Sequence, residues 1–144
     1  EEYDSAYFYY KKFVSIREDR GLDIYPQEDS KIAFVYQKMG LDADAEKFFT
    51  HFSEYCEQDQ STTRSANLAV KYAYEGKIEQ SIEQLKILSE ADNYQFWYLL
   101  IEDDPVLNPI KNHPAFDGIM QKIKDRFWEN QARLRASFEE EGLL

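Results

Sequence analysis

Large hydrophobic residues recur along most of this chain at the three- and four-residue spacing of one face of an α-helix. Ala45, Phe49, Phe52 and Cys56 follow one another at i, i+4, i+7 and i+11. This spacing predicts a single buried stripe on a helix of about four turns. With equivalent stripes before and after it, the pattern predicts an all-α fold.

The hydrophobic pattern is repeated after 36 residues. At this offset small residues fall on small ones, hydrophobic residues on hydrophobic ones, and glycine on glycine. The matched pairs are Ile32 with Leu68, Ala33 with Ala69, Tyr36 with Tyr72, Gly40 with Gly76, Ala45 with Ser81, Phe49 with Leu85, and Phe52 with Leu88. The alanine allows another helix to approach closely, and the glycine lies where the first helix must end. The chain therefore contains two copies of a helix pair.

Both copies resemble the tetratricopeptide repeat. The first reads I-A-x-x-Y-x-x-x-G-L-x-x-D-A-x-x-F-F over residues 32–49, and the second reads L-A-x-x-Y-x-x-x-G-K-I-x-x-S-I-x-x-L over residues 68–85. The family's usual unit is about 34 residues long, and its early tryptophan and closing proline are absent here. The resemblance implies a right-handed α-solenoid of antiparallel helix pairs, with repeats at about 28–56 and 63–90.

The segment before the repeats predicts one further helix. Within residues 4–18, Ala6, Tyr10 and Phe13 have the spacing of Ala45, Phe49 and Phe52. We interpret this helix as the second half of a repeat whose first half lies upstream. Its apolar face then needs cover from elsewhere.

The segment after the repeats predicts a cap at residues 92–125. Residues 104–116 read D-P-x-L-x-P-I-x-x-x-P-x-F. This spacing resembles the closing segment of tetratricopeptide modules at the C-termini of bacterial regulatory proteins. We expect its prolines to end one helix and begin the next, and Leu107, Ile110 and Phe116 to close the open end of the array. The array then covers residues 1–125.

A long amphipathic C-terminal helix follows this cap, and residues 126–144 extend it beyond the array. Phe127, Leu134 and Phe138 continue its hydrophobic stripe. These side chains need cover that few other elements remain to give. We therefore expect self-association through them, as a homodimer; the alternative is that the helix folds back across the array.

Composition and charge narrow the class of partner. The 144 residues are 43% hydrophobic and 16% aromatic, enough for an ordered core. The net charge of −11 argues against nucleic acid and anionic lipid as partners of this domain. Residues 1–60 hold 14 acidic and 7 basic side chains, so a basic or neutral partner is easier to accommodate there. The longest apolar run, residues 96–101, is too short to span a membrane.

No catalytic or metal-binding pattern is found. His51, Cys56 and His113 lack the spacing of zinc ligands, and Cys56 lies on an apolar stripe, which favours a buried thiol. The acidic clusters lack EF-hand spacing, and the sequence has no phosphate-binding glycine loop and no nucleophile elbow. We expect neither an enzyme nor a bound metal or cofactor.

A protein or peptide partner is the remaining expectation. In tetratricopeptide arrays the first helix of each pair lines a concave groove. By register, the residues facing it are Phe34, Gln37, Lys38, Asn67, Val70 and Tyr74. Aromatic side chains beside amides suit an extended peptide. The alternative is that the two aromatic rings only pack against neighbouring helices.

Two functions are consistent with these features. The first is a protein-interaction or sensory module of a larger bacterial regulatory or signalling protein. The second is a structural adaptor that dimerises through its C-terminal helix. The chain opens at Glu1 without methionine, so we expect a part of a longer protein whose signal or anchor could lie upstream. Its compartment stays open.

Overall fold

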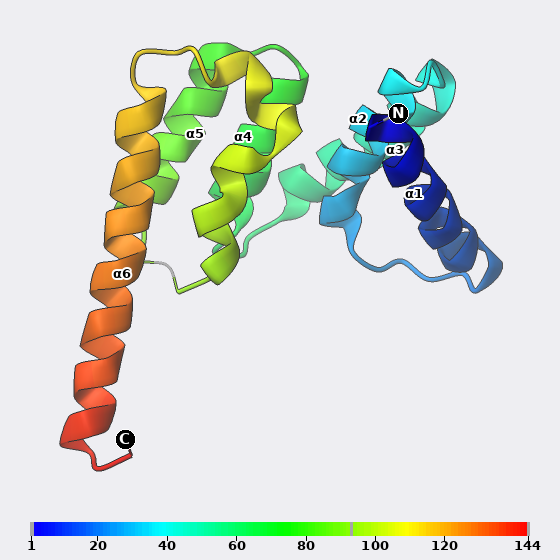
Figure 1. The fold of residues 1–144 in the computed structure, drawn as a ribbon. Coiled ribbons are helices and arrows are strands. Elements are labelled where there is room, and N and C mark those ends of the chain that lie inside the picture. Colours follow the sequence, from blue (N-terminus) through cyan, green and yellow to red (C-terminus); the bar gives the residue numbers. More distant parts are fainter. Residues whose placement is uncertain (1, 93, 144) are drawn as a thin grey trace. The chain divides into compact units, whose positions relative to one another are not determined.

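The structure is a computed structural model that describes residues 2–92 and 94–143, and these residues form helices and turns with no β-strand (Figure 1). The prediction of an all-α fold is confirmed. The chain divides into two compact units, Glu1–Gln60 and Ser61–Leu144. Each unit is described by itself.

The first unit is built from three α-helices and one short 3₁₀ helix. In chain order they are α1 (Glu2–Asp19), η1 (Pro26–Glu28), α2 (Asp29–Lys38) and α3 (Asp42–Gln58). Helix α2 packs against both α1 and α3. The core of this unit includes the buried side chains of Ile32, Ala33, Phe52 and Cys56. Of the stripe expected on α3, Ala45, Phe52 and Cys56 are buried, whereas Phe49 is only half-buried and its neighbour Phe48 is buried instead.

Helix α1 meets α2 through Tyr3 and Tyr7, which lie on the same side of the helix as the expected stripe of Ala6, Tyr10 and Phe13. Tyr3 and Tyr7, one helical turn apart, place their rings edge-on against Phe34 and Tyr36, with centroid distances of 5.8 and 5.1 Å. Phe13, from the expected stripe, is only half-buried. The two tyrosines make this contact because i and i+4 lie on one helix face.

The second unit holds a helix pair, two 3₁₀ helices and one long helix. They are α4 (Arg64–Tyr74), α5 (Ile78–Glu90), η2 (Phe96–Asp103), η3 (Pro105–Ile110) and α6 (Phe116–Glu140). The segment η3 packs on α4 and α5, and α6 packs on α5 and η2. Leu107, Ile110 and Phe116 are buried, so the residues expected to close the array do fill an interior.

The two helix pairs share one turn geometry. Gly40 and Gly76 have positive φ angles of 75° and 71°. In the first turn Leu41 N–H donates to Tyr36 O at 2.9 Å, and in the second Lys77 N–H donates to Tyr72 O at 2.8 Å. Both turns are Schellman motifs, which explains why glycine is required at each. The repeat is therefore present in local structure, whereas the stacking that a solenoid requires stays a prediction.

Helix α6 extends past the other elements of its unit (Figure 1). Phe127 and Asn130 are the last buried side chains along it. Every side chain from Ala132 to Leu143 is exposed. About three turns of α6 thus have no cover from the described residues of this unit.

Candidate protein-binding surfaces

The predicted groove residues of the first unit are partly engaged within the chain. Gln37 and Lys38 are exposed on α2. Phe34 is half-buried, since its ring meets Tyr3 and the Nζ of Lys38 lies 5.2 Å from its centroid. Phe34 therefore packs against an upstream helix, which is the alternative that the sequence left open.

The predicted groove residues of the second unit offer less surface. Asn67 and Val70 are each only 8% exposed. The Nδ2 of Asn67 donates to Thr63 Oγ1 at 3.3 Å, and α4 is packed against η3. Tyr74, at the end of α4, is half-buried. These three side chains therefore contribute mainly to the packing of the unit and line no open groove on α4.

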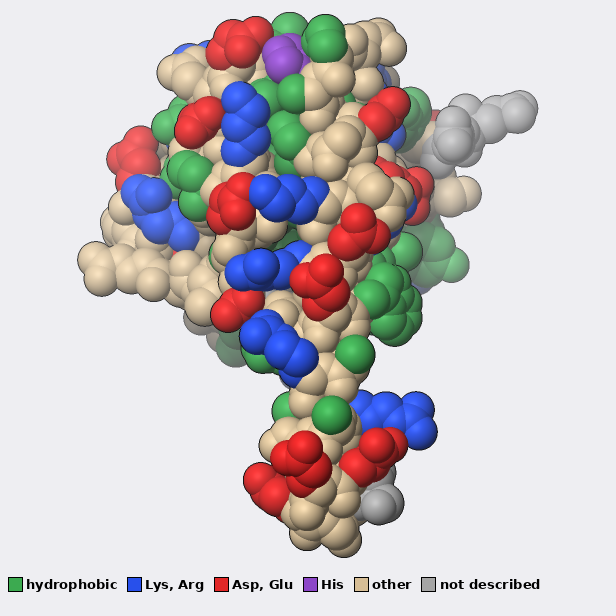
Figure 2. All heavy atoms as spheres, turned by 90° about the vertical axis from the view of Figure 1, so that its left-hand side faces the viewer, with side chains coloured by type: hydrophobic (Ala, Val, Ile, Leu, Met, Phe, Trp, Pro, Cys, Tyr) green, Lys and Arg blue, Asp and Glu red, His purple; other side chains and the backbone are tan. Residues whose placement is uncertain are grey.

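Four further exposed hydrophobic side chains lie on η2 and α6, two elements that pack together. They are Phe96, Trp97, Leu100 and Trp128, which we call the η2–α6 surface. Phe96 is 61% exposed and Trp128 is 58% exposed. Phe127 lies between them, with its centroid 6.2 Å from that of Phe96 and 5.1 Å from that of Trp128. Figure 2 looks onto α6 and shows hydrophobic side chains gathered beside its middle.

The geometry of η2 explains why these side chains point outward. A 3₁₀ helix has three residues per turn, so positions i and i+3 share a face. Tyr98 and Ile101 form its buried face. Trp97 and Leu100, one position earlier, form an exposed face instead. The three-residue period is what separates the buried face of η2 from its exposed face.

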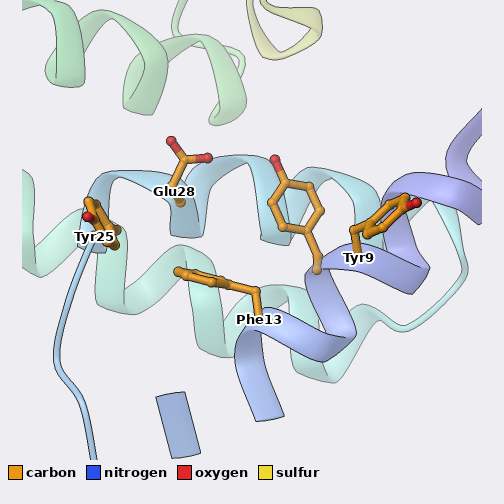
Figure 3. A pocket seen from close by; sticks show the side chains of 5 residues that line it. Tyr9, Phe13, Tyr25 and Glu28 are labelled. Atoms are coloured by element: carbon orange, nitrogen blue, oxygen red, sulfur yellow. The ribbon is translucent and has the colours of Figure 1, made fainter. Parts of the chain in front are cut away.

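A pocket of about 300 Å³ opens on the first unit between α1 and the start of η1 (Figure 3). Its lining side chains are Tyr9, Tyr10, Phe13, Tyr25 and Glu28. The rings of Phe13 and Tyr25 are 6.4 Å apart between centroids. Figure 3 shows Tyr25 at one end of the pocket and Tyr9 at the other, with the carboxylate of Glu28 directed away from the ring of Phe13. Three aromatic residues on one helix are visible in the sequence, whereas the loop that completes the pocket is not.

The residues expected to drive self-association divide into two groups. Phe127 is buried within its own unit against Phe96, so it does not provide a free surface, contrary to expectation. Phe127 is covered because η2 packs against α6 and places Phe96 beside it. Leu134 and Phe138 are each 39% exposed on the uncovered turns. They continue the stripe of Phe127, being seven and eleven residues farther along one helix.

Each of the three residues considered as a metal ligand has a contact or a buried position that accounts for it. Cys56 is buried in the core of the first unit. The Nδ1 of His51 lies 2.5 Å from the buried carboxylate of Asp29, and the Nε2 of His113 lies 3.4 Å from Glu79. Among residues 2–92 and 94–143, no group of three or more His, Cys, Asp or Glu side chains is arranged to hold a metal ion.

Two perturbed carboxylates occur in surface ion pairs of the second unit. Burial alone would raise the pKa of Glu75, but hydrogen bonds from Lys77 and Lys71 outweigh it and lower that pKa below 4.5. The hydrogen bond and charge of Lys122 lower the pKa of Glu90. In the first unit, desolvation and then the neighbouring Tyr7 raise the pKa of Tyr36. None of these three groups lines the pocket of the first unit described above.

No family model, no curated protein and no solved structure matches this chain. The tetratricopeptide resemblance therefore rests on the residues quoted above and stays a prediction. Within the part of the chain that the structure describes, no helix combines the length and the apolar character needed to cross a bilayer.

Proposed function

We propose that this chain is a protein-interaction module that binds another protein through the η2–α6 surface. The observation that supports it is the exposure of two tryptophans, a phenylalanine and a leucine on two elements that pack together. Large aromatic side chains dominate the energetics of protein interfaces. Monomeric proteins rarely leave such side chains grouped and open to water without a use for them.

Charged pairs flank this surface in the way that a polar rim flanks an interface core. Lys124 lies 2.6 Å from Glu102, and Arg126 lies 3.1 Å from Asp92. Figure 2 shows side chains of both signs along the face of α6 that looks toward the viewer. The rim is held by salt bridges within the unit, so its side chains need little further ordering when a partner docks.

The two tryptophans of the chain both belong to this surface, so intrinsic fluorescence reports on its occupancy. A peptide display library selected on the whole chain supplies the probe. Selected peptides should shift the tryptophan emission of the wild type and bind at least tenfold more weakly to Trp128→Ala, since truncating a central aromatic costs about 2 kcal/mol. Peptides that bind the variant equally well would refute the proposal.

A matched control uses an exposed hydrophobic residue outside the surface. Ile87 on α5 is 46% exposed and is not part of the η2–α6 surface. Ile87→Ala should leave the selected peptides bound as tightly as before.

The wider setting, a larger bacterial regulatory or signalling protein, is supported only by the resemblance of residues 104–116.

Self-association through the end of α6 is a second candidate function, and the charges along that end favour it. Arg133 and Arg135 lie on either side of Leu134 in the sequence, and three glutamates at 139–141 follow Phe138. In an antiparallel pair of two such helices, the arginines of one copy lie opposite the glutamates of the other. Leu134 and Phe138 would then meet between the two helices.

A further inference from the structure

We propose that the pocket of the first unit binds the cationic side chain of a lysine or arginine from a basic segment of the partner protein. This inference rests on the proposed protein-binding function and adds the chemistry of the partner. It concerns a different unit and different side chains from the η2–α6 surface. The site is the row of aromatic rings from α1 and Tyr25, closed on one side by Glu28.

The aromatic lining suits a cation. The face of an aromatic ring carries negative potential and attracts an ammonium or guanidinium group within about 6 Å. Phe13 already contacts a cation of the chain, since the guanidinium carbon of Arg17 lies 5.4 Å from its centroid, so the exposed rings of Tyr9 and Tyr25 are the ones that a ligand cation would meet. On the same helix the Nζ of Lys12 lies 4.1 Å from the centroid of Phe8. The rings of α1 thus engage cations within the chain itself.

Glu28 supplies a carboxylate at the edge of these rings. The Nζ of Lys31 lies 3.4 Å from the Oε1 of Glu28, in a pair whose side chains are both about one-third or more exposed. Such a pair is weak. Because Glu28 also lines the pocket, a cation bound there would be attracted to its carboxylate.

The backbone at Tyr25 is held in an unusual conformation that places the last ring. Tyr25 has φ 55° and ψ 51°, the left-handed region, and it precedes Pro26. Aromatic residues seldom adopt this region, and a residue before proline normally prefers an extended backbone. Its ring is nevertheless 57% exposed. Strain retained for an exposed side chain is a reason to look for a ligand.

The charge of the whole unit favours the same ligand. Residues 1–60 hold 14 acidic and 7 basic side chains, a net charge of 7 − 14 = −7. A basic segment is drawn toward such a surface, and an acidic one is repelled. The size also agrees, since a pocket of about 300 Å³ admits one long side chain.

The test is an NMR titration of the full chain with three short peptides that differ at one position. Ac-GGKGG-NH₂ and Ac-GGRGG-NH₂ present a cation, and the norleucine version presents a neutral chain of similar shape. We expect both cationic peptides to shift the Tyr and Phe ring resonances of the pocket, with dissociation constants of about 1 mM or tighter. No shift, or equal binding of the norleucine peptide, overturns the proposal.

Two variants locate the site. Tyr25→Gly removes a wall of the pocket at a backbone position that glycine adopts without strain, so the fold should persist while binding falls about threefold or more. Glu28→Gln should weaken binding about three- to tenfold. Glu18→Gln, an exposed carboxylate of α1 outside the pocket, is the control and should bind as the wild type does. Unchanged binding in both pocket variants overturns the proposal.

The readout separates this inference from the proposed function. The titration follows tyrosine and phenylalanine rings, whereas the η2–α6 surface is followed by tryptophan emission. A negative titration together with a tryptophan shift by selected peptides rejects the cation site alone. The reverse pattern rejects the η2–α6 surface alone.

Discussion

Arg17 donates hydrogen bonds to both carboxylate oxygens of Asp29, at 2.6 and 3.3 Å. Arg17 lies near the end of α1, and Asp29 is the first residue of α2 and has no exposed surface. His51 of α3 reaches the same carboxylate. One buried side chain therefore links the three α-helices of the first unit.

Removing this carboxylate should destabilise the first unit strongly. Asp29→Ala leaves the guanidinium of Arg17 nearly buried without its partner, and breaking a buried pair in this way costs about 3–5 kcal/mol. Far-UV circular dichroism during urea unfolding is the suitable measurement, because both tryptophans lie in the second unit. The matched control is Glu18→Ala, whose exposed pair with Lys47 at 3.2 Å should be worth less than about 1 kcal/mol. Equal losses in the two variants would contradict the linking role of Asp29.

Two glycine substitutions should act in opposite directions. Gly76 has a φ of 71°, and Gly118 lies within α6; an added Cβ meets nothing within 4 Å at either position. Gly76→Ala should therefore lose about 1 kcal/mol from backbone conformation alone. Gly118→Ala should gain about 0.5–1 kcal/mol from helix propensity. Tryptophan emission during urea unfolding measures both, and a stabilising Gly76→Ala would exclude the Schellman turn.

The stability contributed by Glu75 should depend on pH. Its pKa is lowered in the folded state, although burial opposes this, because Lys77 and Lys71 donate hydrogen bonds to it. A depressed carboxyl pKa stabilises the folded state above the unfolded pKa, which is about 4.5, and that contribution is lost as the pH falls through the folded value. Glu75→Gln should therefore be less stable than the wild type at pH 7, by under about 1 kcal/mol because solvent screens the pair.

The difference between the two proteins should shrink as the pH falls through the lowered pKa of Glu75, because the carboxyl then becomes neutral like the amide. Thermal unfolding between pH 3 and pH 7 measures the difference. A gap of constant size across this range would mean that the charge of Glu75 contributes nothing.

Removal of the last turns of α6 should abolish any self-association without harming the fold. Deleting residues 132–144 takes away only side chains that lie at the surface among those described, so thermal stability should change little. Sedimentation velocity should show a concentration-dependent dimer for the whole chain and a monomer for the shortened one. A cut at residue 125 would be a poor test, because it also removes the buried Phe127 and Asn130.

The charge pattern gives a sharper form of this test. Arg133→Glu with Arg135→Glu should weaken an antiparallel dimer, since like charges then face each other. Adding Glu139→Arg and Glu140→Arg should restore it. If the whole chain sediments as a monomer at all concentrations, the adaptor hypothesis is wrong.

The sequence predicted those parts of the fold that depend on local periodicity. The 36-residue offset located both glycine turns, and the hydrophobic stripe of α3 identified Phe52 and Cys56 as buried. Helix period and glycine conformation are properties of short segments, so a single sequence reveals them. The closing residues Leu107 and Ile110 were recognised by the prolines around them.

The binding surfaces were harder to predict because they depend on which segments return to meet each other. Phe127 and Leu134 look equivalent on a helix stripe, yet η2 covers the first and leaves the second open. The pocket needs Tyr25, which has a left-handed backbone conformation. That conformation cannot be predicted from the residue being a tyrosine. A tyrosine directly before a proline, twelve residues after Phe13 in a loop, was the one hint available.

The continuity of α6 has a consequence for how its exposed end could recruit a partner. The first turns of a helix are the unfavourable ones to form, and later turns add to an existing nucleus at little cost. In α6 that nucleus is anchored by Ile123 and Phe127 inside the unit. The outer turns are therefore helical because they extend the packed turns, which supply the nucleus. A partner helix would meet Leu134 and Phe138 already in register, with less conformational entropy to lose on docking than a disordered tail would have.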